Sequence, residues 1–250
     1  MTIREKKGKV NMRRIFLTGD THNDLEINRI SFKNFPLGKE LTKNDLIIVL
    51  GDFGFPWLGD NCDNYWLDWI EDRPFSLAFI DGNHVNFPLL YEYPEEQWMG
   101  GKTNVLRPHI HHLSRGEIFT FNNQTFFCFG GARSIDKAYR KEGRSWWPQE
   151  IPNAKEMANG ADKLYECNYK VDFILTHCAP NYVTDILFPY ENQHDDVTNY
   201  LEKVVRQNTD FKKWFMGHYH IDRSYEDQKY NILYHDILEI MPDGRWELVG

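Results

Sequence analysis

The sequence has 250 residues, of which 41% are hydrophobic and 26% are charged, and its formal net charge is −8. This composition is typical of a globular α/β domain with a large core, and the negative charge disfavours a surface that binds long nucleic acid. No apolar run reaches the roughly 18–20 residues of a membrane span. An acidic protein that acts on phosphates must gather positive charge locally, and a metal ion is a compact source of it.

The N-terminal segment is basic but lacks the apolar stretch of a signal peptide. We therefore expect residues 1–12 to form a solvated extension and residues 13–250 to form a single domain. The four cysteines are scattered and include no Cys-x-x-Cys pair. This spacing favours reduced thiols in a cytoplasmic protein over a disulfide framework or a thiolate zinc site.

Apolar runs of strand length recur along the chain, and five of them end in polar residues of interest. Continuous apolar runs of this kind predict strands that are buried on both faces. In chain order the five segments are "RRIFLTGDTH" (13–22), "DLIIVLGDFG" (45–54), "SLAFIDGNH" (76–84), "VDFILTHCAP" (171–180) and "WFMGHYH" (214–220).

Helices and hairpins are predicted between these strands. The candidate helices are 24–33, 63–71, 153–166 and 196–207, the last with Asp195 or Asp196 as its N-cap. The segment "GEIFTFNNQTFFCFGG" predicts a hairpin that turns at Asn122 and Asn123. A second hairpin is predicted near the end of the chain, with its turn around Asp227 and Gln228.

The polar residues at the strand ends have the chemistry of metal ligands. In open α/β sheets, ligands bind beyond the carboxyl ends of the strands. Carboxylates, imidazoles and an amide oxygen suit divalent Mn, Fe, Zn or Co. Seven such groups exceed the needs of one ion, whereas two ions about 3.5–4 Å apart could share a carboxylate and clamp a phosphoryl group.

The motifs "GDTH" (19–22), "GDFG" (51–54), "GNH" (82–84), "THCAP" (176–180) and "GHYH" (217–220) stand in an order that resembles the calcineurin-like metallophosphoesterase superfamily. The segment "FFCFGGARSIDKAYRKEGRSWWPQEIP" (126–152) is similar to that of bacterial and phage members. The resemblance implies an α+β or α/β fold, a four-layer double β-sandwich flanked by helices. It also implies hydrolysis of a phosphomonoester or phosphodiester, with a small phosphate ester as substrate.

The resemblance further implies a role for each motif residue. Two divalent ions would be bound, with Mn²⁺ favoured and Fe, Zn, Co or Ni as alternatives, and a hydroxide bridging them would attack phosphorus. His84 would bind the phosphate oxygens or protonate the leaving oxygen. The expected ligands are Asp20, His22 and His220 for the first ion, Asn83, His177 and His218 for the second, and Asp52 as the bridge.

Two positions depart from the pattern of the superfamily. Val85 follows "GNH" where many members have an acidic residue, and "GDFGFPW" has Phe55 in place of the aspartate of the protein-phosphatase motif "GDxxDRG". Both departures argue against a Ser/Thr protein phosphatase. They also leave the partner of His84 open, because that aspartate helps to orient the histidine.

The segment "GGARSIDKAYRKEGR" carries several basic residues after two glycines. Arg133 or Arg140 could bind a substrate phosphate through its guanidinium fork, or Ser134 could cap a short helix with a solvated basic side. Trp146 and Trp147 could stack on a nucleobase, although core packing is the commoner use of such a pair.

The histidines of a further segment are better explained by structural roles. His109 and His111 in "RPHIHHL" share a strand face and could hold a third metal, but polar strand positions are the favoured interpretation because no acidic residue stands nearby. The whole sequence predicts a dinuclear metal-dependent phosphoesterase. Its rival is a catalytically silent binding or scaffold protein of the same fold, which we would expect to have lost one or more of the ligands.

Overall fold

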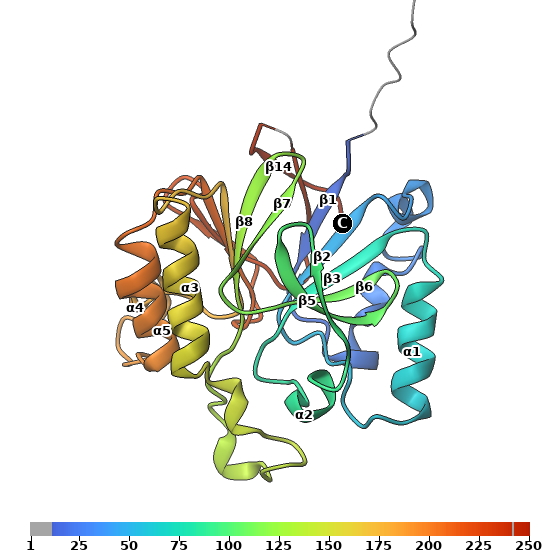
Figure 1. The fold of residues 1–250 in the computed structure, drawn as a ribbon, viewed down its shortest axis with the longest axis horizontal. Helices are drawn as coiled ribbons and strands as arrows, with labels where there is room; N and C mark the ends of the chain where they lie inside the picture. The colour runs from blue at the N-terminus through green and yellow to red at the C-terminus, as the bar shows by residue number, and fades with distance from the viewer. Residues whose placement is uncertain (1–11, 242) are drawn as a thin grey trace, which may run out of the picture.

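The computed structural model describes residues 12–241 and 243–250, so the predicted extension over 1–12 lies outside the described residues except for Met12. Two β-sheets face one another, and helices cover the outer face of each (Figure 1). The predicted four-layer arrangement of two sheets flanked by helices is therefore confirmed. Within the described residues, no helix is long and apolar enough to cross a membrane.

The first sheet has eight strands in the order β14-β13-β1-β2-β3-β6-β5-β4. Its strands β1, β2, β3 and β6 are parallel neighbours, and every residue of β1, β2 and β3 is buried, as their continuous apolar runs predict. The strand bounds are β1 Ile15–Thr18, β2 Leu46–Leu50, β3 Ser76–Ile80, β4 Glu95–Trp98, β5 Gly101–Arg107, β6 Ile110–Leu113, β13 Ile237–Ile240 and β14 Trp246–Leu248.

The second sheet has six strands in the order β11-β12-β10-β9-β8-β7. Both predicted hairpins are confirmed. Asn122 and Asn123 join β7 to β8 with φ of 52° and 61°, which the tight hairpin turn requires, and Asp227 and Gln228 turn between β11 and β12. The bounds are β7 Glu117–Phe121, β8 Gln124–Phe129, β9 Phe173–Thr176, β10 Lys213–Met216, β11 Arg223–Tyr225 and β12 Tyr230–Ile232.

Successive side chains of the central strands point to opposite faces of the sheet, so they fill the core on both sides of it. On β2, Ile47 packs outward in the same cluster as Leu67 of the covering helix. The next residue, Ile48, points inward to the layer between the sheets, which also contains Leu175 of β9. A third cluster lies between the second sheet and its helices.

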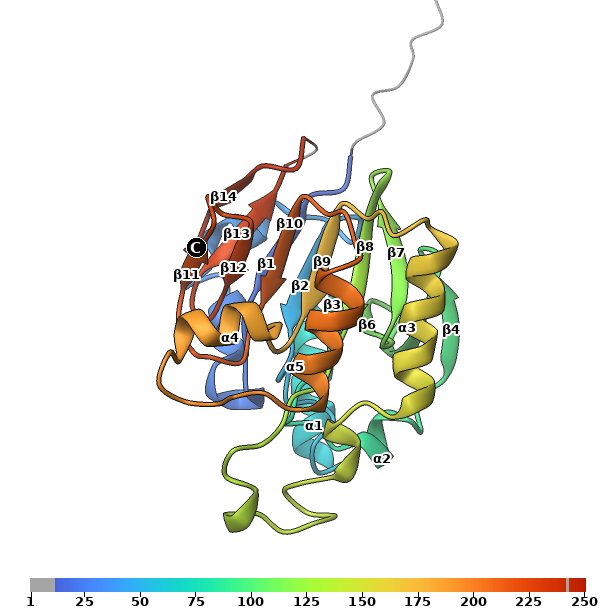
Figure 2. The same cartoon turned by 90° about the vertical axis from the view of Figure 1, so that its left-hand side faces the viewer.

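Helices lie on both outer faces, and α3, α4 and α5 lie across the second sheet (Figure 2). The predicted helices over 63–71 and 153–166 are confirmed, and Asn153 begins the latter with a capping box. The bounds are α1 Asn61–Glu71, α2 Phe87–Leu90, α3 Ala154–Glu166, α4 Asn181–Leu187 and α5 Asp196–Tyr200, with shorter helical segments η1 Asn23–Leu25, η2 Ile27–Ile30, η3 Pro36–Glu40, η4 Lys137–Tyr139, η5 Pro148–Glu150 and η6 Leu201–Arg206.

The α-helix predicted over 24–33 is wrong, because the chain forms the short 3₁₀ segments η1 and η2 there. The N–H groups of His22 and Asn23 donate to the carbonyl oxygens of Asp52 and Phe53, at 2.8 and 3.1 Å. Both residues also have positive φ. These contacts with the next motif hold the start of the segment in a loop conformation, and no side chain caps either helical segment.

The helix predicted over 196–207 is confirmed in outline. Asp195 accepts hydrogen bonds from the N–H groups of Val197 and Thr198 and is the N-cap. After α5 the backbone widens into the π-helical segment η6. The four cysteines are free thiols, as their spacing predicts.

Candidate metal centre

The five motif strands end at one edge of the sandwich. Strands β1, β2 and β3 run parallel in the first sheet, and β9 and β10 run parallel in the second, so their carboxyl ends deliver the motif loops to the same region. All seven donors expected from the sequence, together with His84, are brought there.

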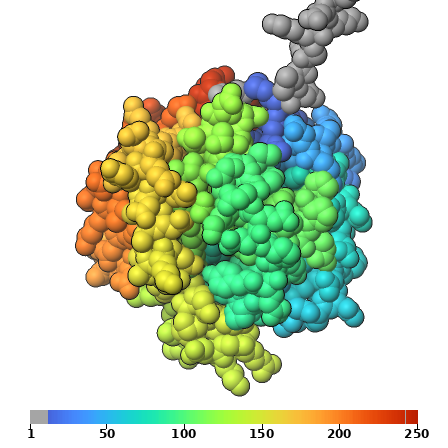
Figure 3. Space-filling model, viewed as in Figure 1, coloured from blue at the N-terminus to red at the C-terminus, as the bar shows by residue number. Residues whose placement is uncertain are grey.

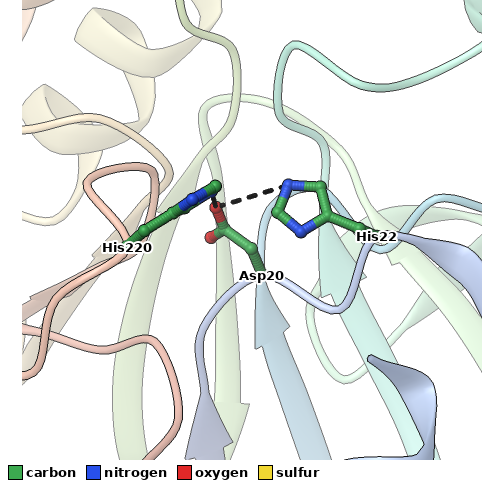
Figure 4. A group of neighbouring side chains, drawn as sticks. All are labelled: Asp20, His22 and His220. Carbon is green, nitrogen blue, oxygen red and sulfur yellow. Dashed lines mark ion pairs between the residues drawn. The ribbon is translucent and has the colours of Figure 1, made fainter. Parts of the chain in front are cut away.

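Asp20, His22 and His220 form what we call the first half-site (Figure 4). The Oδ2 atom of Asp20 lies 3.1 Å from Nε2 of His220 and 4.0 Å from Nε2 of His22. This carboxylate oxygen is buried yet accepts no hydrogen bond. A buried acceptor without a donor is costly unless a cation satisfies it, so the arrangement fits a bound ion.

Asp52 lies between this group and the next. Its Oδ2 atom is 3.6 Å from Nε2 of His22 and 3.4 Å from Nε2 of His177. Its Oδ1 atom accepts a hydrogen bond of 2.7 Å from the N–H group of His84. One carboxylate therefore borders both groups of donors.

Asn83, His177 and His218 form what we call the second half-site. The Nε2 atom of His177 lies 3.2 Å from Oδ1 of Asn83, and its ring centroid lies 4.9 Å from that of His218. The Nδ1–H group of His177 donates to the carbonyl oxygen of Leu50 at 2.8 Å, which leaves Nε2 free to bind an ion. His177 is fully buried.

Ser134 and Glu150 orient the side chain of Asn83, and sequence reasoning missed this pair. The Nδ2 atom of Asn83 donates to Oγ of Ser134 at 3.3 Å, so the amide oxygen is directed away from that contact. The hydroxyl of Ser134 donates in turn to Oε2 of Glu150 at 2.6 Å. Ser134 is therefore buried behind the second half-site, and the N-cap position of η4 is taken by Asp136.

Three glycines of the motifs leave space for these donors. A Cβ atom on Gly51 would lie 1.9 Å from Nδ1 of His177, and one on Gly82 would lie 2.2 Å from Oδ1 of Asp52. A Cβ atom on Gly217 would lie 2.3 Å from Oδ1 of Asp20. Asp52, Asn83 and His218 can lie so close to the other donors only because the residue before each of them has no side chain.

The charges of the centre favour a cation. Burial lowers the pKa of His177, but the carboxylates of Asp52 and Asp20 outweigh it and raise this pKa to about 9. Burial and then His177 lower the pKa of His218 to about 4. Two buried carboxylates thus draw positive charge into the centre, where a divalent ion would compete with protons.

The donor set as a whole fits divalent ions. Over residues 12–241 and 243–250, three groups have ligand atoms that all lie within 4.8 Å of one another: Asp20, His22 and His220; His22, Asp52 and His84; Asp20, Asp52 and His177. Carboxylates, imidazoles and the amide of Asn83 are ligands that Mn, Fe, Zn and Co accept. No thiolate takes part in these groups.

Arg140 is the neighbour of His84 that the sequence left open. Its Nη2 atom lies 2.8 Å from Nε2 of His84, and its Nε atom donates to Oδ1 of Asp136 at 2.6 Å. The His84 ring also faces Trp57, with centroids 6.5 Å apart. A guanidinium therefore faces the ring of His84.

The segment that carries Arg140, between β8 and α3, projects from the body of the molecule (Figure 3). The other candidate in this segment, Arg133, lies 3.7 Å from Oδ2 of Asp195 and has an exposed side chain. Trp146 and Trp147 are buried, as the packing interpretation predicts. Of the two arginines, the structure brings Arg140 to His84.

The histidines of β6 and its approach have partners of their own. The Nδ1 atom of His109 lies 2.6 Å from Oε1 of Glu71, and the ring of His111 stacks on Trp98 at 4.2 Å. His112 pairs with Asp81 and Asn104. Among the described residues, none of these three histidines joins a group that could hold a metal.

The comparisons with known proteins give one family match and several similar structures. The model of the calcineurin-like phosphoesterase family matches residues 13–222. The comparison with curated proteins gives no match.

Three solved structures are similar over most of this chain. The phosphopantetheinyl hydrolase PptH from Mycobacterium tuberculosis is 12% identical, with a TM-score of 0.46, and the match covers 89% of this chain and 88% of that one. The calcineurin-like phosphoesterase YfkN from Bacillus subtilis is 11% identical, with a TM-score of 0.41 and coverage of 94% and 87%. A putative 5'-nucleotidase from Staphylococcus aureus is 11% identical, with a TM-score of 0.48 and coverage of 94% and 52%.

Proposed function

The chain belongs to the calcineurin-like phosphoesterase family, and we propose that it hydrolyses a phosphomonoester or phosphodiester with the help of two divalent metal ions. The observation that carries the proposal is the close approach of Asp20, His22, Asp52, His177 and His220, together with a buried oxygen of Asp20, Oδ2, that accepts no hydrogen bond. We assign Asp20, His22 and His220 to the first ion. We assign the second half-site to the second ion and Asp52 to both.

Two ions held in this way, with Mn²⁺ favoured, would polarise the phosphoryl oxygens and lower the pKa of water. The side chains of the protein would bind the substrate and transfer the protons that the reaction requires. His84 lies beside His22 of the first half-site, with ring centroids 5.3 Å apart, and its ring nitrogen Nε2 faces the guanidinium of Arg140. We assign it to the phosphate oxygens and to the proton that the leaving oxygen receives.

Arg140 supports the binding of phosphate. Its guanidinium is held by Asp136 and directs two N–H groups toward His84. A planar guanidinium can donate to two phosphate oxygens at once. The N–H groups of Arg140 that now point toward His84 would therefore donate to a phosphate that enters the site. The substrate that suits this site is a small phosphate ester.

The proposal is tested by hydrolysis of p-nitrophenyl phosphate and bis-p-nitrophenyl phosphate. Protein stripped with a chelator is assayed with and without added Mn²⁺, and we expect cleavage of at least one ester only when the ion is present. His109→Gln is the matched control, because His109 pairs with Glu71 outside the centre. Cleavage that survives chelation would contradict the proposal, and two bound ions without cleavage of either ester would favour the silent scaffold.

A further inference from the structure

Glu26 lies directly behind His22. Its Oε2 atom is 2.9 Å from Nδ1 of His22, while Nε2 of the same ring faces the carboxylates of Asp20 and Asp52. An imidazole that donates Nδ1–H to a carboxylate keeps its Nε2 lone pair for an ion and cannot rotate freely. Glu26 therefore selects both the orientation and the tautomer in which His22 can act as a ligand.

Tyr234 plays the corresponding part for His220. The two rings stack with centroids 4.5 Å apart and planes 7° apart. The hydroxyl of Tyr234 donates to Oε1 of Glu26 at 2.5 Å, so both oxygens of that carboxylate are used. His220 needs such support, because 49% of its side chain is exposed and its backbone has φ of 52°.

Other contacts hold this pair in place. Arg29 lies with its Cζ atom 5.3 Å from the centre of the Tyr234 ring, and its Nη2 atom is 3.8 Å from Oε2 of Glu26. The same guanidinium donates to the carbonyl oxygen of Asp20 at 3.0 Å. The N–H group of Tyr234 donates to Asp222 at 2.7 Å. Contacts within the chain therefore hold both Glu26 and Tyr234 in place.

We propose that Glu26 and Tyr234 are positioning residues that hold His22 and His220 in the geometry that the first metal ion needs. The inference rests on the proposed function, and it adds residues that touch neither ion nor substrate. The second half-site has a separate support, since His177 donates to the carbonyl oxygen of Leu50. Losing either positioning residue should therefore weaken the first ion and leave the second unchanged.

The two half-sites are separated by variants that each remove one of them. Asn83→Ala leaves the first half-site, and His220→Ala leaves the second. Mn²⁺ binding is measured by calorimetric titration after Glu26→Gln, Tyr234→Phe or Tyr234→Leu is added to each background. Phenylalanine removes only the hydroxyl that binds Glu26, whereas leucine also removes the ring that stacks on His220. We expect binding to weaken by about 10–100-fold in the Asn83→Ala background, the usual effect of removing a residue that supports a metal ligand. In the His220→Ala background we expect no change.

The two substitutions should not be additive. Because Glu26 and Tyr234 share one hydrogen bond, the double variant should lose less affinity than the product of the two single losses. Tyr182→Phe and Glu226→Gln are matched controls, since Tyr182 donates to Glu226 in a second tyrosine–glutamate pair. These control variants should bind Mn²⁺ like their parent.

Unchanged affinity in the Asn83→Ala background, or equal losses in both backgrounds, would overturn the inference. If a background variant does not fold, the same test is made on the wild-type chain, where only one of two binding steps should weaken. Failure of the proposed function gives a different result: the wild-type protein would bind no Mn²⁺, or would bind two ions without hydrolysing either ester. The first of these results would overturn the inference as well, and the second would leave it standing.

Discussion

His177 in the second half-site is fully buried, whereas His220 in the first leaves 49% of its side chain exposed. The buried ring is fixed by a carbonyl oxygen at the end of a central strand. The exposed ring is fixed by stacking on Tyr234, which belongs to another segment. The comparison teaches that a buried imidazole can be fixed by the main chain of a strand, while an exposed imidazole depends on a side chain from a distant segment.

The largest effect is expected at Asp52, which borders both half-sites. Asp52→Asn removes a charge that both ions would share, so Mn²⁺ affinity should fall at both by more than about 100-fold, the upper end of the range for residues that only support ligands. Hydrolysis should fall with it. Calorimetric titration and the ester assay measure the two effects. Full occupancy of both ions in this variant would rule out the shared carboxylate.

A substitution of His84 should affect turnover without affecting metal binding. We expect His84→Gln to keep both ions, because its ring faces Arg140, and to lower kcat by about 10²–10⁴-fold, as the loss of a group that transfers a proton does. Metal content by elemental analysis and kcat for the better ester decide the outcome. Loss of one ion would show instead that His84 is a ligand, and the division into two half-sites would then have to be redrawn.

The smallest effect is expected on stability, and it comes from His111, which lies outside both half-sites. Burial, with a smaller contribution from His109, lowers its pKa to about 4. In the unfolded chain the imidazole of His111 has a pKa near 6.5, so as the pH falls it binds a proton before the folded protein does. The contribution of neutral His111 to the free energy of unfolding is therefore complete above about pH 6.5 and is lost as the pH falls toward 4. The loss in the free energy of unfolding is at most about 3 kcal/mol.

Urea unfolding of metal-free protein at pH 7 and pH 4 measures this loss. His111→Phe keeps a ring against Trp98 and should reduce the dependence on pH, while Mn²⁺ binding at neutral pH stays unchanged. An identical dependence in the variant and its parent would mean that His111 contributes nothing. The acid sensitivity would then come from other groups with shifted pKa values, such as Asp172 and Glu202.

Much of the fold and of the candidate centre could be predicted from the sequence. Continuous apolar runs predicted β1, β2 and β3, and these strands are buried on both faces. The residues at the strand ends predicted which donors would meet, since parallel strands bring their carboxyl ends to one edge. The Asn122–Asn123 turn was predictable because only a few residue types accept positive φ at both positions.

Contacts between distant segments were decided only by the tertiary structure. The segment after His22 has a helical pattern, but hydrogen bonds to Asp52 and Phe53 impose a loop and 3₁₀ turns on it. The choice of Arg140 over Arg133, and the pairing of Glu26 with Tyr234, have no local signal either. By itself the sequence determined the five strands that end in the motifs and the donors that these strands carry, because those features depend on neighbouring residues. The residues that orient these donors, such as Glu26 and Tyr234, are far apart in the sequence and meet only when the sheets pack together.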